Sequence, residues 1–357
     1  MNRRRLRLRN KRLCKVFSVL YYKAKMQRAI QETDNDAFSC KISAISKKYL
    51  PSPAQKSISS QFENYEDIHM EFCKEIKSRS RRKFGSITKA CRQSFPVMNY
   101  GTYLRTVSID LKLSQYLQNH SSKVQVLNLG CGSDLRMLPF LASNPNMQWI
   151  DLDYKEIVGF KATIFQMNEK FRAALQLQPP AKDTSETQTF DSIISERYQL
   201  LPCNITDTKQ LISVLERFSN PNIPTVIISE CVLCYLDQDK ASQLITNITN
   251  FYKEGFWISY DPIGGSDTND RFGSIMQDNL RESRQLNMPT LMIYNSQEKY
   301  KSRFPGKTEI QTMWFYYQNL IDETERQRLK RLQFLDEIEE LQVIFSHYVI
   351  CTSLWSS

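Results

Sequence analysis

Four polar side chains stand where predicted strands end, and side chains of these types could bind a polar ligand together. Asp151 and Asp153 close one predicted strand, Asn204 closes the next, and Glu230 ends the one after that. Parallel strands bring their carboxyl ends to one edge, where open α/β sheets bind ligands. Glu230 directly follows an apolar run, and a carboxylate buried there costs free energy unless it is paired or faces a cleft. The pattern therefore predicts a ligand site at this edge.

The stretch Val124–Asp134, VQVLNLGCGSD, predicts a buried strand that runs into a glycine turn. Gly130 and Gly132 allow a sharp turn and leave room for a ligand against the main chain. A strand, a Gly-x-Gly turn and a helix form the nucleotide-binding edge of Rossmann-like sheets. Leu135 replaces the third glycine of the dinucleotide pattern. This difference argues against a dinucleotide and favours S-adenosylmethionine, which carries no phosphate.

Strands and helices alternate at short spacing from Lys123 onward, which predicts a doubly wound parallel sheet. We expect helices over 155–176 and 325–342, and strands over 307–317 and 345–355. We expect these late strands to provide an antiparallel strand at one edge of the sheet. The fold class is therefore α/β, with a Rossmann-like doubly wound sheet. The five parallel strands are expected near 124–129, 147–154, 198–205, 225–230 and 255–262.

Three segments flank or interrupt this sheet. Residues 32–122 are expected to form a helical lid, whose first helix would start at a capping box made by Thr33 and Asp36. The α/β domain is expected over 123–357, with a lid insertion at about 263–307. Residues 1–31 form a basic extension, for which a presequence, a disordered arm and a start of translation at Met26 all stay open.

The net charge of +10 comes from the extension, because residues 1–31 hold eleven Lys or Arg and no acid. The remaining chain carries 37 basic and 38 acidic residues, so the composition gives no support to nucleic-acid binding by the folded part. No apolar run is long enough to predict a membrane span. A further basic cluster, KSRSRRK, lies between Lys77 and Lys83; it predicts either a solvated face or a surface for an acidic partner.

Nine scattered cysteines and no convincing secretory signal favour a reducing compartment. Cys231 and Cys234 form a CxxC pair without a second pair to complete a zinc site. The three histidines, His69, His120 and His347, are not at metal-ligand spacing. We therefore expect no metal site, and we interpret the cysteines as small packing residues.

Seven stretches of the chain resemble the leucine carboxyl methyltransferases, and the resemblance covers nearly everything after Met26. This family methylates the C-terminal leucine carboxylate of the protein phosphatase 2A catalytic subunit and uses S-adenosylmethionine. The amino-acid sequences of these motifs are most similar to those of the fungal branch. The matching stretches are TDNDAFSCKISAISKKYL, FPVMNYGTYLRT, LNLGCGSDLRMLP, WIDLDY, ISECVLCYL, NDRFGSIMQDNL and LQFLDEIEELQ.

The resemblance implies a role for each matching position. Arg105 would hold the carboxylate of the cofactor, with Lys41 nearby, and Gly130 would lie against its methionine part. Asp153 would bind the ribose hydroxyls, while Glu230 would hold the amino-acid end. Asn204 and Ile205 would contact the adenine, although many members have Asp where Asn204 stands; Asn keeps a carbonyl acceptor and adds a donor. Tyr235 is a candidate substrate contact, and no residue is expected to act as an acid or base.

The expected partner is the phosphatase catalytic subunit, bound through its tail and surface by a monomeric, cytoplasmic enzyme; a nuclear location stays open. Three alternatives also stay open. The first is a methyltransferase for another carboxylate or for a modified tRNA base, although the related tRNA branch carries a β-propeller that is not present here. The second is a non-catalytic scaffold for the phosphatase, which would have no need of Gly130, Asp153 and Glu230. The third is nucleic-acid binding through residues 1–31 alone.

Overall fold

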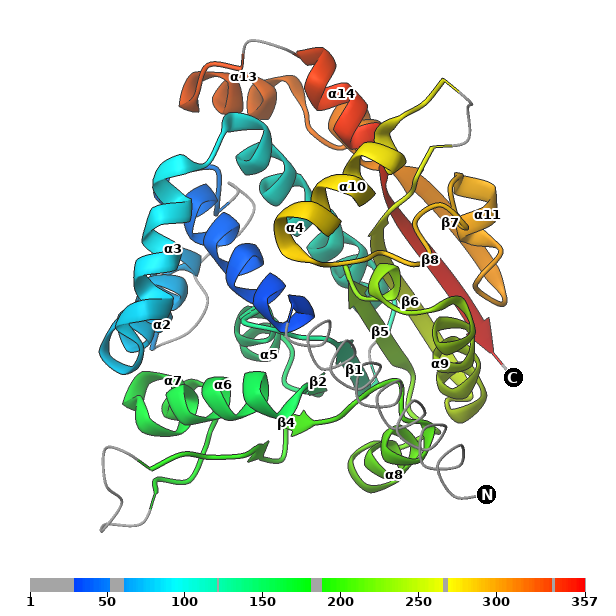
Figure 1. The fold of residues 1–357 in the computed structure, drawn as a ribbon. Coiled ribbons are helices and arrows are strands. Elements are labelled where there is room, and N and C mark those ends of the chain that lie inside the picture. Colours follow the sequence, from blue (N-terminus) through cyan, green and yellow to red (C-terminus); the bar gives the residue numbers. More distant parts are fainter. Residues whose placement is uncertain are drawn as a thin grey trace, which may run out of the picture.

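An eight-stranded sheet with helices on both faces forms the centre of the computed structural model (Figure 1). The structure describes residues 29–51, 61–120, 122–180, 188–265, 269–335 and 338–356. The basic extension before residue 29 lies outside the described residues. The strands are β1 (Val124–Leu129), β2 (Met147–Asp153), β3 (Ile193–Ile194), β4 (Tyr198–Pro202), β5 (Thr225–Glu230), β6 (Glu254–Pro262), β7 (Lys307–Thr312) and β8 (Tyr348–Ser356).

The strand order is β3-β4-β2-β1-β5-β6-β8-β7. The five strands from β4 to β6 are parallel, as the alternation predicts. The chain winds outward from β1 through β2 to β4 and then returns to β5 on the other side of β1. This reversal places the turn after β1 beside the end of β5, at the switch point where such sheets bind ligands.

Both edges of the sheet carry antiparallel strands. At one edge β8 pairs with β6 and β7 pairs with β8, so both predicted late strands lie in the antiparallel part of the sheet. At the other edge the short β3 pairs with β4 and was not predicted. Two residues carry too little periodicity to indicate a strand.

Helices cover the two faces of the sheet separately. The N-terminal helix (residues 29–46), α4 and α6 pack on one face, and α8 and α9 pack on the other. Alternate residues of the same strand serve the two cores: Val126 faces the first group and Leu127 the second. The remaining bounds are α2 (Tyr65–Arg79), α3 (Arg81–Gln93), α4 (Pro96–Gln118), α5 (Met137–Ser143), α6 (Lys155–Met167), α7 (Glu169–Ala174), α8 (Thr208–Phe218), η1 (Leu233–Tyr235), α9 (Gln238–Phe251), α10 (Phe272–Arg284), α11 (Gln297–Lys301), α12 (Met313–Asn319), α13 (Glu323–Leu332) and α14 (Ile338–Ser346).

Hydrogen bonds from side chains to the backbone explain why three predicted helix or strand boundaries were wrong. Thr33 is inside the N-terminal helix, which already runs at residue 29, and its hydroxyl donates to the Ile30 carbonyl (2.6 Å) instead of capping. The helix predicted over 155–176 is divided at Asn168, whose side chain caps α7. The strand expected over 307–317 ends early because Thr312 caps α12.

The helix predicted over 325–342 is also divided, into α13 and α14. Gln333 has an extended backbone directly after α13. Its side-chain oxygen accepts a hydrogen bond from the buried Asn99 of α4 (2.7 Å). This contact is tertiary, so the local pattern gave no sign of the break.

Asp151, one of the strand-end acids, serves the fold and not the ligand edge. Its carboxylate is fully buried and accepts from Lys161 Nζ (2.8 Å), Trp149 Nε1 (2.7 Å) and the Tyr198 hydroxyl (2.8 Å). Asn128 adds a fourth donor at 3.0 Å. Asp151 therefore ties β1, β2, β4 and α6 together. No helix among the described residues is long and apolar enough to cross a membrane.

Replacing Lys161 with Met should lower the free energy of unfolding by about 3–5 kcal/mol, because the buried Asp151 carboxylate would lose the cation that pairs with it. Urea unfolding at neutral pH measures the change. Lys155 lies on the same helix and its pair with Asp191 is exposed, so Lys155→Met should change the stability by less than about 1 kcal/mol. Equal losses in the two variants would contradict this assignment.

Candidate active site

A cavity of about 1230 Å³ lies at the carboxyl ends of the central strands. The turn after β1, the ends of β2 and β5, and α4 line it, and the first half of the N-terminal helix covers it. Of the predicted site residues, those that line the cavity are Lys41, Arg105, Gly130, Asp153, Ile205, Glu230 and Tyr235.

The glycine turn has the backbone that only glycine adopts easily. Gly130 and Gly132 have φ of +60° and +48°, in the left-handed region. A Cβ on Gly130 would lie 2.9 Å from the Val232 side chain, and one on Gly132 would lie 2.7 Å from Asp34 Oδ1. The turn is therefore closely packed from two sides, and residues 130–134 line the cavity.

Asp153 is held by the backbone at the end of β2. Its Oδ2 accepts from Gly132 N and its Oδ1 from Tyr154 N, each at 2.7 Å. Each oxygen keeps lone-pair capacity toward the cavity, which suits the vicinal hydroxyls of a ribose. Burial raises the pKa of Asp153 to about 6, against the lowering effect of these backbone donors.

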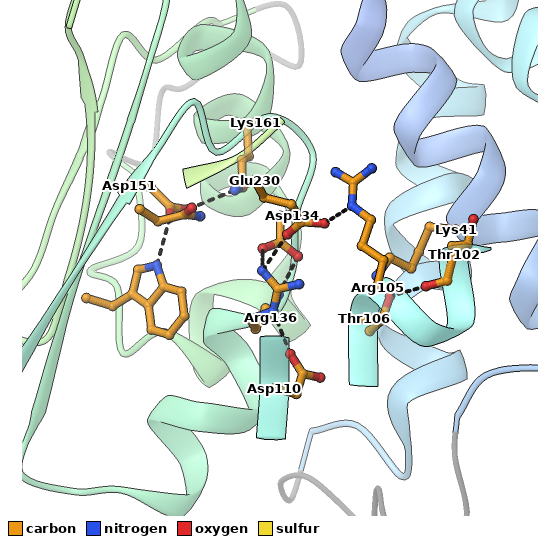
Figure 2. Close-up of polar contacts among 12 residues, drawn as sticks. Lys41, Thr102, Arg105, Thr106, Asp110, Asp134, Arg136, Asp151, Lys161 and Glu230 are labelled. Carbon is orange, nitrogen blue, oxygen red and sulfur yellow. Dashed lines mark hydrogen bonds and ion pairs between the residues drawn. The ribbon is translucent and has the colours of Figure 1, made fainter. Parts of the chain in front are cut away.

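Glu230 lies between two arginines at the end of β5 (Figure 2). Arg105 Nε of α4 donates to one oxygen, and Arg136 Nη1 donates to the other at 2.9 Å. Burial alone would raise the pKa of Glu230, but the charges of Arg105, Arg136 and Lys41 hold it well below its usual value. The carboxylate is therefore ionised at neutral pH.

Arg136 also belongs to this cluster, and no sequence motif predicted a role for it. Its side chain is only 2% exposed, and it also binds Asp110 (2.6 Å) and Asp134 (2.8 Å). Three carboxylates from α4, the glycine turn and β5 thus share one guanidinium. One feature of the sequence could have indicated a buried arginine: Arg136 stands between the apolar Leu135 and Met137 at the start of a predicted helix.

Lys41 and Arg105 bring two cations to the same wall. Lys41 Nζ donates to the Thr106 hydroxyl at 2.5 Å, and Arg105 lies 5.0 Å from the centre of the Tyr260 ring. Burial and the neighbouring Arg136 lower the pKa of Lys41. These cations line the cavity beside Glu230, so the site presents positive and negative charge within a few ångströms. This arrangement matches a zwitterionic amino-acid group.

The adenine side of the site differs from the prediction in one detail. The wall there is made by Cys203 and Ile205, while Asn204 has an exposed side chain outside the cavity lining. Its Oδ1 accepts from Thr206 N (3.2 Å) and the Thr206 hydroxyl (2.8 Å). Contact between Asn204 and the adenine stays a prediction, as does the role of Tyr235.

His69 also lines the cavity, although no sequence motif predicted a role for it. Burial and the Lys41 charge lower its pKa to about 3, so the imidazole is neutral at physiological pH. Its Nδ1 lies 2.8 Å from the Tyr65 carbonyl oxygen. A base this weak cannot take a proton efficiently near neutral pH. His69 therefore contributes shape to the wall.

Asp34 fastens the N-terminal helix to the glycine turn. Its Oδ1 accepts from Ser133 N (2.6 Å) and its Oδ2 from the Ser133 hydroxyl (2.9 Å). Lys83 of α3 binds the same carboxylate at 3.2 Å. The cover of the cavity and the turn beneath it are thus held by one acid, which local sequence patterns did not single out.

S-adenosylmethionine fits this set of residues. Lys41 and Arg105 suit its carboxylate, Glu230 its ammonium group, Gly130 its methionine chain and Asp153 its ribose. Among the described residues no group of three or more His, Cys, Asp or Glu could hold a metal ion. The cavity is also larger than a single small-molecule site requires, which leaves room for a second ligand.

Arg105→Ala should weaken binding of S-adenosylmethionine by about 10-fold to 100-fold, because a charge-assisted hydrogen bond contributes about 1.5–3 kcal/mol. Isothermal titration calorimetry measures the affinity, and circular dichroism checks the fold. Lys112→Ala on the same helix, outside the cavity lining, is the control and should bind normally. Unchanged affinity in Arg105→Ala would refute its assignment as the carboxylate anchor.

The affinity for S-adenosylmethionine should fall as the pH falls through about 6, the pKa to which burial raises Asp153. Protonation removes the charged acceptor, so affinity at pH 5 should be about tenfold lower than at pH 7. In Asp153→Asn the affinity should be low and nearly constant over this range. Titrations at several pH values separate the two; a flat profile in the unmodified protein would contradict the assignment.

Comparison with known proteins identifies the family. The model of the leucine carboxyl methyltransferase family matches residues 29–249. A leucine carboxyl methyltransferase 1 from Kluyveromyces lactis is 68% identical over 334 residues, covering 92% of this chain and 99% of the relative. One from Eremothecium gossypii is 47% identical and covers 92% of this chain and 100% of the relative.

A solved DUF574 family protein from Streptomyces avermitilis has a similar fold, with a TM-score of 0.51 at 9% identity. It covers 80% of this chain and 97% of its own. The sheet order, the cavity at the switch point and the matched family agree on a methyltransferase of the Rossmann-like type. The chain belongs to the leucine carboxyl methyltransferase family, whose methyl donor is S-adenosylmethionine.

Proposed function

We propose that this enzyme methylates the C-terminal leucine carboxylate of the protein phosphatase 2A catalytic subunit and thereby regulates assembly of the holoenzyme. The family and its relatives supply the reaction class. The observation that carries the substrate side of the proposal is a second, apolar compartment in the same cavity as the proposed cofactor residues.

This compartment is rich in sulfur and begins directly after Glu230. The buried cluster beneath it contains Cys234, Met288 and Leu291. The cavity wall includes Met288 of this cluster and four residues that pack against the cluster, namely Cys231, Tyr235, Met276 and Leu280. Flexible thioether side chains adapt to branched apolar groups. A leucine side chain placed here would bring its carboxylate toward the charged half of the cavity.

The reaction requires positioning more than acid–base chemistry. A bound S-adenosylmethionine supplies a methyl group on a sulfonium, and a C-terminal carboxylate with a pKa of roughly 3.3–3.7 is already an anionic nucleophile at neutral pH. No proton has to be removed, which agrees with the neutral His69 in the wall. The ionic cluster around Glu230 and the glycine turn would hold the donor. Correct alignment of two reactants can supply roughly 7–11 kcal/mol.

The cover of the cavity would add to this effect. A carboxylate surrounded by water is a weaker nucleophile, and a closed site removes that water. The N-terminal helix closes the cofactor side through Asp34, and α10 contributes Ile275, Met276 and Leu280 to the substrate side. The helical lid and the insertion would thus exclude water from both halves.

Incubation with methyl-labelled S-adenosylmethionine should transfer label to a purified phosphatase catalytic subunit and give a base-labile ester. Removal of the last leucine should abolish transfer, because the acceptor carboxylate and its side chain would be misplaced. Bulk tRNA and a peptide ending in lysine serve as comparison acceptors. Labelling of tRNA, or equal labelling with and without the leucine, would refute the proposal; absence of any transfer would favour a scaffold.

A further inference from the structure

Helix α3 lies on the outside of the helical layer (Figure 1) and carries a concentrated positive charge. Its thirteen residues contain five cations and no acid, whereas residues 32–357 together are almost neutral. Only Ile87 of this helix is buried. Four of the five cations are exposed, namely Arg81, Arg82, Lys89 and Arg92.

These four cations share one face of the helix. At 3.6 residues per turn, the positions 81, 82, 89 and 92 fall within an arc of about 100°. We call them the α3 basic face. Gly85 lies within the same arc, and a Cβ added to it would meet nothing within 4 Å. The fifth cation, Lys83, points the other way, toward Asp34. The basic face is therefore open and unobstructed.

The α3 basic face has no structural partner within the described part of the chain: none of its four cations makes an ion pair with a described residue. Like charges three or four residues apart on a helix, such as Lys89 and Arg92, repel each other. Fold stability therefore gives no reason for this arrangement, and a negatively charged binding partner would remove its cost.

The face leads directly to the opening of the cavity. After α3 the chain turns through Phe95, which is 71% exposed, into the first turn of α4. Met98 in that turn is 47% exposed and also lines the cavity. Ile275 and Val343, both about half exposed, line the cavity as well. Apolar residues thus surround the opening, and the α3 basic face extends from one side of it.

We propose that the α3 basic face, together with Phe95 and Met98, binds an acidic surface of the protein whose C-terminal carboxylate enters the cavity. This inference rests on the proposed function and adds the docking surface that function requires. Exposed charges of this kind raise association rates and select partners, and the apolar rim supplies contact area. Continuity with an apolar opening favours a protein over a nucleic acid.

A triple charge reversal, Arg82→Glu with Lys89→Glu and Arg92→Glu, tests the face in the full-length enzyme. We expect the Kd for the purified phosphatase catalytic subunit to rise about tenfold or more at low salt, and to depend less on salt. The affinity for S-adenosylmethionine and the kcat at saturating substrate should not change. The control is a triple reversal of exposed cations on α8 and α9, Lys209→Glu, Arg217→Glu and Lys240→Glu, which should leave the Kd unchanged.

A second variant adds charge without removing any native side chain. Gly85→Glu introduces an acid into the middle of the face, where there is space for it. It should weaken binding of the catalytic subunit several-fold relative to Gly85→Gln, which has the same size and no charge. Both replacements should favour the helix over glycine, so a loss of folding cannot explain the difference.

The outcomes separate the two proposals. If the unmodified enzyme neither binds nor methylates the catalytic subunit, the proposed function fails. If it does both, and the α3 and control reversals give equal Kd values, the docking surface is refuted and the function stands. If the α3 reversal abolishes binding of homopolymeric RNA while leaving the subunit unaffected, the face serves a nucleic acid and the docking surface is again refuted.

Discussion

The buried guanidinium of Arg136 is the interaction on which the rest of the site depends. It holds one carboxylate from α4, one from the glycine turn and one from β5, so the helical lid and the switch point of the sheet cannot move independently. With Lys41 and Arg105 included, three cations face Asp110, Asp134 and Glu230. A buried cluster of this kind is tolerable because its charges balance, and removing one member would leave another uncompensated. The balance also explains why Glu230 stays ionised although it is enclosed.

A second connection runs from the N-terminal helix to Asp153, the residue expected to bind the ribose. Asp34 binds both hydrogen-bond donors of Ser133, and the adjacent Gly132 donates to Asp153. Asp34 and Asp153 are also close enough that their charges repel, which adds to the raised pKa of Asp153. A ligand that donates hydrogen bonds to the Asp153 carboxylate would reduce this repulsion. The position of the N-terminal helix and the charge of Asp153 are therefore linked through one turn.

The sequence was informative where a feature depends on local pattern and uninformative where it depends on distant partners. Apolar runs bounded by turn residues were enough to predict the five parallel strands, and Gly130, Asp153 and Glu230 were placed at the correct edge by their positions at strand ends. The interpretation of Asp151 needed the structure, because Lys161, Trp149 and Tyr198 meet it only after the strands pair. Arg136 and Asp34 were missed for the same reason. Lys41 and Arg105 came from family resemblance, since a cation on a predicted helix is usually solvated.

Charge is divided in this molecule between two tasks that require opposite arrangements. Inside, the cations around Glu230 are matched by acids at short distance, so their combined field decays quickly outside the site. The deep site can therefore align a zwitterionic ligand, but it attracts an acidic macromolecule only weakly. Attraction over a distance of about 10 Å requires charge that is exposed and unpaired. The cations of α3 meet that requirement, and they lie beside the opening and not within it. An enzyme that binds a whole protein at a small, water-excluding cavity would gain from this separation, because the surface charges can be screened by salt without disturbing the buried cluster around Glu230.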